Sequence, residues 1–476
     1  MNDTPSQAWN VEPDAVVDPK GRPAGPVDYS VIAESRSAQE ESLYRVLIVG
    51  GGAGGLELAT RLGETLGRRG KASIVLLDKA RVHVWKPHLH EIASGALEID
   101  VDSVEYLAHA RAHHYRFRTG AMCGLDRGKR RIYVEPVADE DGNPLIPPRI
   151  IGYDTLIMAV GSICNDFSTP GVREHAFALD SADEATRFNR KLINACIRAN
   201  AQYEPLHPRQ LHCVVIGAGA TGVELVAELH QTMREFAAYG LDNIDFDKLI
   251  RLTIVEAGPR ILGPLPQKLA DSVYDMLKQL GVEVLTGQQV VEVTGEGVRL
   301  ADGSFISAEM VVWAAGIKAP DFLRDLDGLE TDRLNRLIVR DTLQTSLDDN
   351  IFALGDCACH LLPKDGSPAP PRAQTAHQMA SLVERGVKAQ LKGEKLPIFK
   401  YRDFGSLVNL SEYGTVGNLF GVAEKRSVYL EGVVARVMYR SLHKMHQRVL
   451  HGTVKTMIDT LAGLLSRHRE PRIKLH

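Results

Sequence analysis

The order of apolar and polar residues near the start of the chain predicts a strand, a helix and a second strand. Residues 44–50 (YRVLIVG) form an apolar run of the buried type that ends in a cluster of glycines. Residues 56–66 then have helical periodicity, and residues 72–78 (ASIVLLD) form a second apolar run. This order is typical of a βαβ unit with parallel, buried strands.

The same order returns near the middle of the chain. Residues 211–217 (LHCVVIG) form an apolar run that ends in glycine, residues 218–229 have helical character, and residues 251–256 (RLTIVE) form the next apolar run. An insertion at 235–249 lengthens the connection before this last strand. The repeat predicts an α/β fold with two Rossmann-like dinucleotide-binding units.

The composition is that of a multi-domain globular protein. With 476 residues, of which 44% are hydrophobic and 24% are charged, the chain can bury two or three cores of ordinary size. Residues 1–42 are polar, rich in acidic residues and without periodicity, so we expect a mobile extension. No run reaches the length of about 18 apolar residues that a membrane span needs. We therefore expect no signal peptide, no transmembrane segment and a cytoplasmic address.

The cysteines indicate free thiols in a reducing compartment. There are six, at positions 123, 164, 196, 213, 357 and 359, and their spacing is not that of zinc ligands. No cluster of histidine, cysteine and carboxylate residues has ligand spacing either, so we expect no metal centre.

Charge is distributed unevenly along the chain. Residues 425–476 hold eleven basic and three acidic residues, a net charge of +8, so the other residues carry −12 of the total of −4. A basic tail on an acidic body favours an anionic surface as its partner, either lipid head groups or nucleic acid.

The first glycine cluster has the spacing of a dinucleotide-binding turn. Gly50, Gly52 and Gly55 fit the pattern GxGxxG, in which the glycines allow a tight turn, a close approach of pyrophosphate and close helix–strand packing. The anion would lie on the free N–H groups at the start of the helix. Asp78, at the end of the next strand, is placed to accept hydrogen bonds from a ribose.

The second cluster repeats this pattern with Gly217, Gly219 and Gly222. Here the acidic residue at the end of the next strand is Glu256, and a carboxylate at this place repels the 2′-phosphate of NADPH and favours NADH. Arg260, four residues further on, weakens that preference. A single glycine-rich turn is as often an ordinary loop, but two copies in the same context predict two nucleotide sites.

Two further segments resemble those of the flavoprotein superfamily that includes glutathione reductase. Residues 153–162 (YDTLIMAVGS), which contain Gly161, look like its strand and turn near FAD. Residues 351–358 (IFALGDCA) look like its FAD motif, in which Gly355 precedes an aspartate that contacts the ribityl-phosphate part. The resemblance implies this role for Asp356.

One motif narrows the choice within that superfamily. Residues 51–122 contain no cysteine, which excludes a disulfide reductase, and residues 373–378 (AQTAHQ) resemble the AQxAxQ quinone motif of the type II NADH:quinone oxidoreductases. Residues 220–229, 314–316, which contain Gly316, and 405–417 also match that family. The resemblance implies an FAD enzyme that passes two electrons from NADH to a membrane quinone, ubiquinone or menaquinone, without pumping protons.

The quinone motif implies a set of binding residues. The prolines at 370–371 keep these two residues out of a helix, and a helix that starts after them places Gln374 and Gln378 on one face. Their neutral amides can donate hydrogen bonds to a quinone carbonyl. Ala373 belongs to the same motif, and His377 is either a proton relay or a surface side chain.

Glu224 has two interpretations. In the helix after the second glycine turn it matches the family's acidic residue where nicotinamide and flavin meet, and the resemblance implies a catalytic role. Without the resemblance it would be an ordinary glutamate favoured by the helix dipole.

The C-terminal segment predicts attachment to a membrane surface. From residue 434 to residue 464 the apolar residues recur at helical spacing, with basic residues of the stretch 436–448 on the opposite side. We expect residues 433–470 to lie in an interface of anionic lipid, where each basic residue adds about 1 kcal/mol. Self-packing of the apolar stripe or a homodimer is the alternative, and nucleic acid is a weaker partner because no array of aromatic residues is present.

These observations predict four regions. They are a mobile extension at 1–43, an FAD-binding domain at 44–168 and 339–395, an NADH-binding domain at 169–338 and a membrane-attachment domain at 396–476. Other functions stay open: a sulfide:quinone oxidoreductase, a soluble NADH-dependent reductase of ferredoxin, or a flavoprotein that senses redox state or binds nucleic acid without catalysis. The first would use Cys164 together with Cys357 or Cys359.

Overall fold

The computed structural model describes residues 43–99, 103–238, 250–420 and 427–466. The chain divides into two compact units, each made of three segments. Unit 1 comprises the described residues of Met1–His83, Val104–Ser162 and Lys318–Tyr401, and unit 2 those of Val84–Ser103, Ile163–Ile317 and Arg402–His476. The predicted N-terminal extension lies outside the described residues.

Unit 1 is built on a six-stranded sheet in the order β23-β24-β11-β1-β2-β5. These strands are β1 (Tyr44–Val49), β2 (Ala72–Asp78), β5 (Arg116–Thr119), β11 (Thr155–Met158), β23 (Gln344–Thr345) and β24 (Asp348–Ala353). All neighbours are parallel except β23 and β24. Consecutive residues of the central strand β1, such as Leu47 and Ile48, are buried, because both faces of the sheet are covered.

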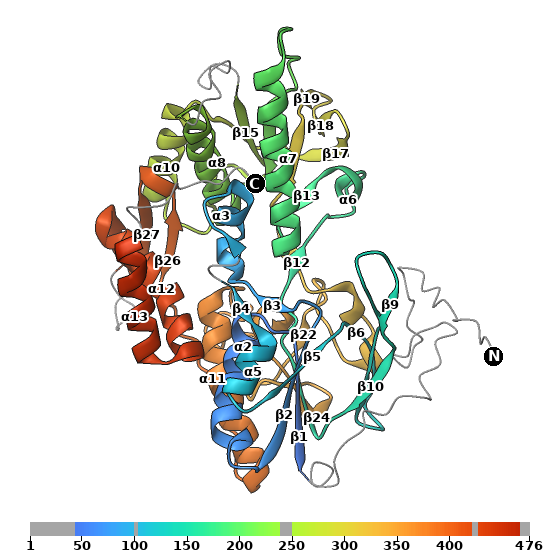
Figure 1. Ribbon diagram of the computed structural model, residues 1–476. Helices are drawn as coiled ribbons and strands as arrows, with labels where there is room; N and C mark the ends of the chain where they lie inside the picture. Colours follow the sequence, from blue (N-terminus) through green and yellow to red (C-terminus); the bar gives the residue numbers. More distant parts are fainter. Residues whose placement is uncertain (1–42, 100–102, 239–249, 421–426, 467–476) are drawn as a thin grey trace, which may run out of the picture. The chain divides into compact units, whose positions relative to one another are not determined.

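Two helices of unit 1, α2 (Ala53–Leu62) and α11 (Ala373–Lys392), lie side by side on the sheet (Figure 1). They approach closely because small residues face each other, and a Cβ atom added to Gly54 would lie 3.3 Å from the Cβ of Ala376. A second, antiparallel sheet contains β6 (Met122–Asp126), β7 (Arg131–Val134) and β10 (Arg149–Gly152).

Unit 2 repeats this plan with a five-stranded parallel sheet in the order β13-β20-β14-β15-β16. The strands are β13 (Phe177–Ala178), β14 (His212–Ile216), β15 (Arg251–Glu256), β16 (Glu283–Thr286) and β20 (Met310–Trp313). The covering helices include α7 (Ala182–Ala201), α8 (Ala220–Ala238) and α10 (Gln267–Gln279), and an antiparallel sheet is formed by β17 (Val290–Thr294), β18 (Gly297–Leu300) and β19 (Phe305–Ser307).

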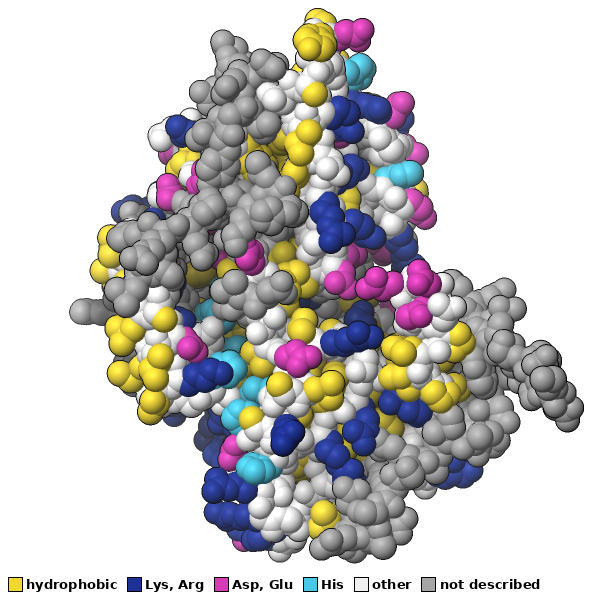
Figure 2. All heavy atoms as spheres, viewed as in Figure 1, with side chains coloured by type: hydrophobic (Ala, Val, Ile, Leu, Met, Phe, Trp, Pro, Cys, Tyr) yellow, Lys and Arg dark blue, Asp and Glu magenta, His cyan; other side chains and the backbone are white. Residues whose placement is uncertain are grey.

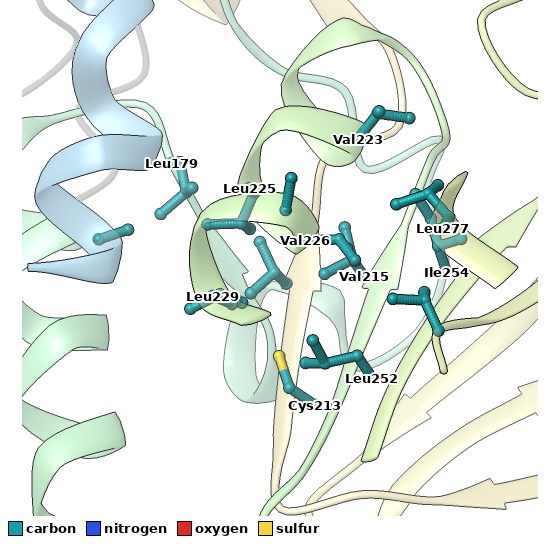
Figure 3. Packing of buried hydrophobic residues seen from close by; sticks show 14 of the residues in the cluster. Leu179, Cys213, Val215, Val223, Leu225, Val226, Leu229, Leu252, Ile254 and Leu277 are labelled. Atoms are coloured by element: carbon teal, nitrogen blue, oxygen red, sulfur yellow. The ribbon is translucent and has the colours of Figure 1, made fainter. Parts of the chain in front are cut away.

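The core of unit 2 explains why the second apolar repeat folds as it does. Figure 3 shows aliphatic side chains of α8 packed onto those of β14 and β15. The labelled members of this cluster are Leu179, Cys213, Val215, Val223, Leu225, Val226, Leu229, Leu252, Ile254 and Leu277. The helix is longer than the prediction of 218–229, since it continues to Ala238 into the insertion, whose residues 239–249 lie outside the described residues.

The C-terminal part of unit 2 is a three-stranded antiparallel sheet followed by two helices. They are β26 (Ser406–Asn409), β27 (Thr415–Phe420), β28 (Ser427–Glu431), α12 (Val433–His451) and α13 (Thr453–Ser466). The sequence pattern predicted one continuous helix, and this was wrong because Gly452, at φ 80° and ψ 165°, separates α12 from α13. Of the helices in the described part of the chain, none combines the length and the apolar character that crossing a membrane requires.

Candidate functional site: two nucleotide turns, a buried glutamate and a paired-amide helix

The turn between β1 and α2, residues 50–55, leaves open space where a phosphate can approach. Gly50 has φ 102°, and a Cβ atom added to Gly55 would collide with the carbonyl oxygen of Gly50. A Cβ atom added to Gly52 would meet no protein atom within 4 Å. Gly50 and Gly55 are therefore needed for the turn and the close packing, while Gly52 borders the space at the N-terminus of α2 that fits a pyrophosphate.

The turn between β14 and α8, residues 217–222, has the same geometry in unit 2. Gly217 has φ 100°, and a Cβ atom on Gly222 would collide with the carbonyl oxygen of Gly217. The space beside Gly219 is open, with no protein atom within 4 Å of an added Cβ atom. Both units thus present open space beside the middle glycine of the turn, at a helix N-terminus.

The acidic residue at the end of each second strand holds its turn in place. Asp78 accepts a hydrogen bond from the backbone N–H of Gly51 at 2.6 Å, and burial raises the pKa of this carboxyl group. Glu256 accepts one from the backbone N–H of Ala218 at 2.8 Å. Each carboxylate keeps further lone pairs for a ribose hydroxyl, the role that the sequence predicts.

Other predicted FAD residues lie together in unit 1. The hydroxyl of Ser162 donates to the carboxylate of Asp356 at 2.8 Å, which joins the end of the β11 segment to the motif after β24. Gly161, at φ 71°, and Gly355, at φ 72°, adopt the left-handed conformation that favours glycine. Gly316, also left-handed at φ 70°, belongs to unit 2.

The paired amides lie at the start of α11. The helix begins at Ala373, as the preceding prolines predicted, and Gln374 and Gln378 are both partly exposed. Their neighbours Thr375 and Met379 are buried. The helix therefore presents the two amides on one side, one turn apart.

His377 contacts the FAD helix. Its Nδ1 lies 2.6 Å from a carboxylate oxygen of Glu57 on α2, and the Glu57 side chain is only 2% exposed. A guanidinium nitrogen of Arg61 lies 3.7 Å from the same oxygen. The His377 side chain keeps 32% of its surface, so it links a buried carboxylate to the surface of α11.

Glu224 is a buried carboxyl group at the start of α8. It is 7% exposed and accepts a hydrogen bond from the backbone N–H of Asn409 at 2.9 Å. Burial, with smaller contributions from the nearby Glu91 and Glu228, raises the pKa of Glu224 to about 8 against the opposing effect of the Asn409 hydrogen bond. A carboxyl group with a pKa near neutrality can give or take a proton at physiological pH.

Two further polar side chains, one of them buried, lie around Glu224. Nδ1 of His90, on α3 (Leu89–Ser94), lies 3.9 Å from a Glu224 oxygen, and Tyr439, on α12, is influenced by the same charge. Burial, together with His88, lowers the pKa of His90 to about 3, so this imidazole stays neutral. In the described part of the chain, neither Nε2 of His90 nor the Tyr439 hydroxyl has a hydrogen-bond partner.

Replacing Glu224 with glutamine should change how stability depends on pH. Because the folded state raises the pKa of Glu224 from 4.5 to about 8, the unfolded chain releases a proton that the folded chain keeps, and stability falls as pH rises through this window. Glu224→Gln removes this loss and keeps an oxygen for Asn409. At pH 4.5 we expect little change in the free energy of unfolding. At pH 8 we expect the free energy of unfolding to rise by about 4 kcal/mol, and Tm to rise with it.

Scanning calorimetry between pH 4.5 and 8.5 measures this difference. Glu296→Gln, at an exposed position of the same unit, serves as the control and should leave the pH profile of Tm unchanged. A Tm difference between Glu224→Gln and the wild-type chain that is the same at every pH would contradict the raised pKa.

The cysteines do not have the environment of reactive thiolates. All six are free, and burial raises the pKa of Cys357 to about 11 and that of Cys164 further still. The described residues also contain no group of three or more histidine, cysteine, aspartate or glutamate residues able to hold a metal ion. Nothing in the geometry therefore favours sulfide chemistry at Cys164.

Sequence reasoning missed Glu57, His90 and Tyr439. Each is separated by more than a hundred residues from the predicted site residue that it approaches, and a histidine, tyrosine or glutamate within a helix gives no signal of its own. Only the fold places them beside His377 and Glu224.

Comparison with known proteins supports one family. The model of the pyridine nucleotide-disulphide oxidoreductase family matches residues 44–380. A type II NADH:quinone oxidoreductase of Haemophilus influenzae is 40% identical over 446 residues, which cover 91% of this chain and 100% of the relative. A type II NADH:quinone oxidoreductase of Staphylococcus aureus is 27% identical over 82% of this chain and 94% of its own length.

Solved structures agree in fold. NDH2 from Plasmodium falciparum in complex with NADH has a TM-score of 0.74 at 18% identity and matches 90% of this chain and 100% of its own. The sulfide:quinone oxidoreductase from Aquifex aeolicus has a TM-score of 0.67 at 17% identity, with 90% and 96% of the two chains matched. The predicted α/β fold with two Rossmann-like units is confirmed. The chain belongs to the pyridine nucleotide-disulphide oxidoreductase family and, within it, to the type II NADH:quinone oxidoreductases.

Proposed function

We propose that separate groups of residues divide the work of this enzyme, a flavoprotein that transfers electrons from NADH to a quinone. FAD, when bound, would supply the two-electron redox chemistry that connects NADH to the quinone. Turn 50–55 would hold the pyrophosphate of FAD, and turn 217–222 that of NADH, because each presents open space at a helix N-terminus.

Side chains around the turns would hold the rest of each nucleotide. Asp78 and Glu256 would accept hydrogen bonds from the riboses, and the charge of Glu256 would exclude a 2′-phosphate. Asp356, oriented by Ser162, would bind the ribityl-phosphate part of FAD. Gly161, Gly316 and Gly355 would allow the backbone to approach the cofactors closely.

We infer that quinone binds at the start of α11, where Ala373, Gln374 and Gln378 lie. The observation that carries this inference is the contact of α11 with the FAD helix, since Ala376 packs against Gly54 of turn 50–55. A quinone held by the two amides would therefore lie beside the bound flavin. His377, paired with Glu57, would hold a proton for the reduced quinone, and Glu224 would exchange a proton near the nicotinamide.

Removing the amides should separate quinone reduction from flavin reduction. We expect Gln374→Ala and Gln378→Ala to lower kcat/KM for a water-soluble quinone about 10- to 100-fold, since each loses a hydrogen bond to the acceptor. Reduction of a one-electron dye by NADH should persist, because NADH and flavin still meet. The measurement is steady-state NADH oxidation with each acceptor.

Gln390→Ala is the matched control, because Gln390 lies on the same helix and bonds to the protein's own oxygens at 3.4 Å. It should keep quinone turnover. Equal loss of quinone and dye activity in Gln374→Ala, or full quinone activity in both amide variants, would place the quinone elsewhere.

We further propose that α12 and α13 attach the enzyme to anionic lipid on the cytoplasmic face of the membrane, without spanning it. Figure 2 shows hydrophobic side chains gathered over these helices. Nine large apolar residues of the pair are 44–76% exposed, whereas α12 buries Ala435, His446 and Leu450 instead. The predicted apolar stripe is thus largely not the face that packs on the protein. Arg440 and Arg448 are also exposed and could meet phosphates.

Glutamate substitutions test this attachment. Val437→Glu with Leu461→Glu places charge on two side chains that are 61% and 60% exposed, so binding to phosphatidylglycerol vesicles should fall more than about 10-fold. Flotation of vesicles measures the bound fraction. Leu145→Glu, at a 52% exposed site of unit 1, should bind as the wild-type chain does. If the double variant floats with vesicles as the wild-type chain does, lipid is not the partner of this face. If the double variant also changes from a dimer to a monomer, the face belongs to a homodimer.

A further inference from the structure

The backbone carbonyl of Gly51 is held by two buried side chains. The hydroxyl of Tyr106 donates to it at 2.7 Å, and Nδ1 of His83 lies 2.9 Å from it. Since a carbonyl oxygen only accepts, Nδ1 of His83 carries the proton. Tyr106 is 2% and His83 4% exposed. With the N–H of Gly51 bonded to Asp78, both polar groups of this residue are fixed from outside the turn.

Local structure brings the two donors together. β3 (Val82–His83) pairs with β4 (Val104–Glu105) in antiparallel register, and α5 (Tyr106–Ala112) begins directly after β4. The ring of Tyr106 stacks on that of Phe117, with centroids 4.7 Å apart. Burial and the nearby charge of Asp78 raise the pKa of Tyr106, so its hydroxyl keeps its proton and remains a donor.

The NADH turn holds the equivalent carbonyl with a different donor. Ala218 occupies the place of Gly51: its N–H is bonded to Glu256, and its carbonyl accepts the backbone N–H of Leu262 at 2.8 Å. Two side chains do this work in one turn and one backbone group does it in the other. The common element is the fixed direction of the carbonyl, which indicates that the direction itself is what both nucleotide sites need.

We propose that Tyr106 and His83 are positioning residues for the pyrophosphate of FAD. The peptide unit between Gly51 and Gly52 is planar and trans, so the N–H of Gly52 points opposite to the held carbonyl. Holding the carbonyl therefore fixes this N–H at the border of the open space beside Gly52. A donor that is ordered before the anion arrives loses no freedom on binding, which strengthens the complex.

The proposal rests on FAD binding at turn 50–55 and does not depend on where quinone binds. Tyr106→Phe keeps the ring and its stacking on Phe117, and His83→Leu removes the second donor. Each should raise the Kd of FAD about 3- to 10-fold, measured from flavin fluorescence released on dilution of the purified holoenzyme. The double variant should raise the Kd of FAD by more than the product of the two single effects, because the donor that remains in each single variant still partly holds the carbonyl. His83→Asn, which returns an N–H near the position of Nδ1, should restore most of the affinity.

Two further measurements distinguish positioning from packing. The ³¹P resonances of bound FAD should shift in Tyr106→Phe, and KM for NADH should stay unchanged, because the NADH turn uses a backbone donor. A double variant that binds FAD as the wild-type chain does, or one with a lower Tm but unchanged ³¹P resonances, overturns the proposal.

Gly52→Ala tests the site itself: if it leaves FAD affinity unchanged, the cofactor does not lie at this turn. If Gly52→Ala weakens binding and the double variant does not, only the role of Tyr106 and His83 is wrong.

Discussion

Replacing Gly219 with alanine should raise KM for NADH about 100-fold while the purified protein keeps its flavin and its Tm. The added methyl group meets no protein atom within 4 Å, so the fold can accept it. It occupies the space through which the backbone approaches a pyrophosphate, and so it acts against NADH alone. Loss of close contact and of a charge-assisted hydrogen bond together account for an effect of about this size.

Steady-state kinetics with NADH, flavin absorbance and thermal unfolding of one preparation test the three parts of this expectation. Gly295→Ala is the matched control, since Gly295 is an exposed glycine of the same unit whose added Cβ has only a side chain 3.9 Å away. An unchanged KM for NADH in Gly219→Ala would move the nucleotide away from turn 217–222.

In the FAD turn, residues 50–55, replacing the last glycine with alanine should lower the stability of the fold. In Gly55→Ala the new methyl group collides with the carbonyl oxygen of Gly50 and lies 3.1 Å from the Cβ of Ala159. Both are part of the sheet and its turn, so neither can move without separating α2 from β1. Overpacking against backbone atoms is among the most destabilising kinds, so we expect the free energy of unfolding to fall by about 3 kcal/mol or more.

We expect Gly55→Ala either to be insoluble or to be recovered without flavin and with a Tm lowered by several degrees. Gly52→Ala is the natural comparison, because its methyl group enters open space and should weaken FAD binding without lowering the Tm of the flavin-free protein. Recovery of yellow Gly55→Ala with the wild-type Tm would show that the close packing of helix and strand is not required.

The sequence was informative where a residue type has one physical use. A glycine that a turn requires at φ near 100°, or a run of apolar residues that a parallel sheet buries on both sides, can be recognised without any tertiary contact. For this reason the two βαβ units and their glycine turns were predictable. The start of α11 was also predictable, because two prolines precede it.

The remainder depends on contacts between distant segments. Glu57 could only be recognised as the partner of His377 once α2 and α11 were adjacent, and the burial that sets the pKa of Glu224 comes from several elements at once. The break at Gly452 escaped notice because the apolar spacing continues across it. The roles assigned to the site residues, and the predicted boundaries of the four regions, stay predictions that the variants above can test.

The interrupted course of unit 1 along the chain affects how the protein can be made. Within its sheet, Leu156 of β11 pairs with Ile351 of β24, and all of the segment Ile163–Ile317, which belongs to unit 2, is synthesised between them. At about 5–20 residues per second, a ribosome takes roughly 10–40 seconds to cover that distance. Until then β11 has an unpaired edge and the sheet lacks α11. A ribosome-bound fragment that ends before β24 therefore cannot complete the FAD sheet, so we expect flavin insertion to follow the synthesis of the segment Ile163–Ile317 of unit 2.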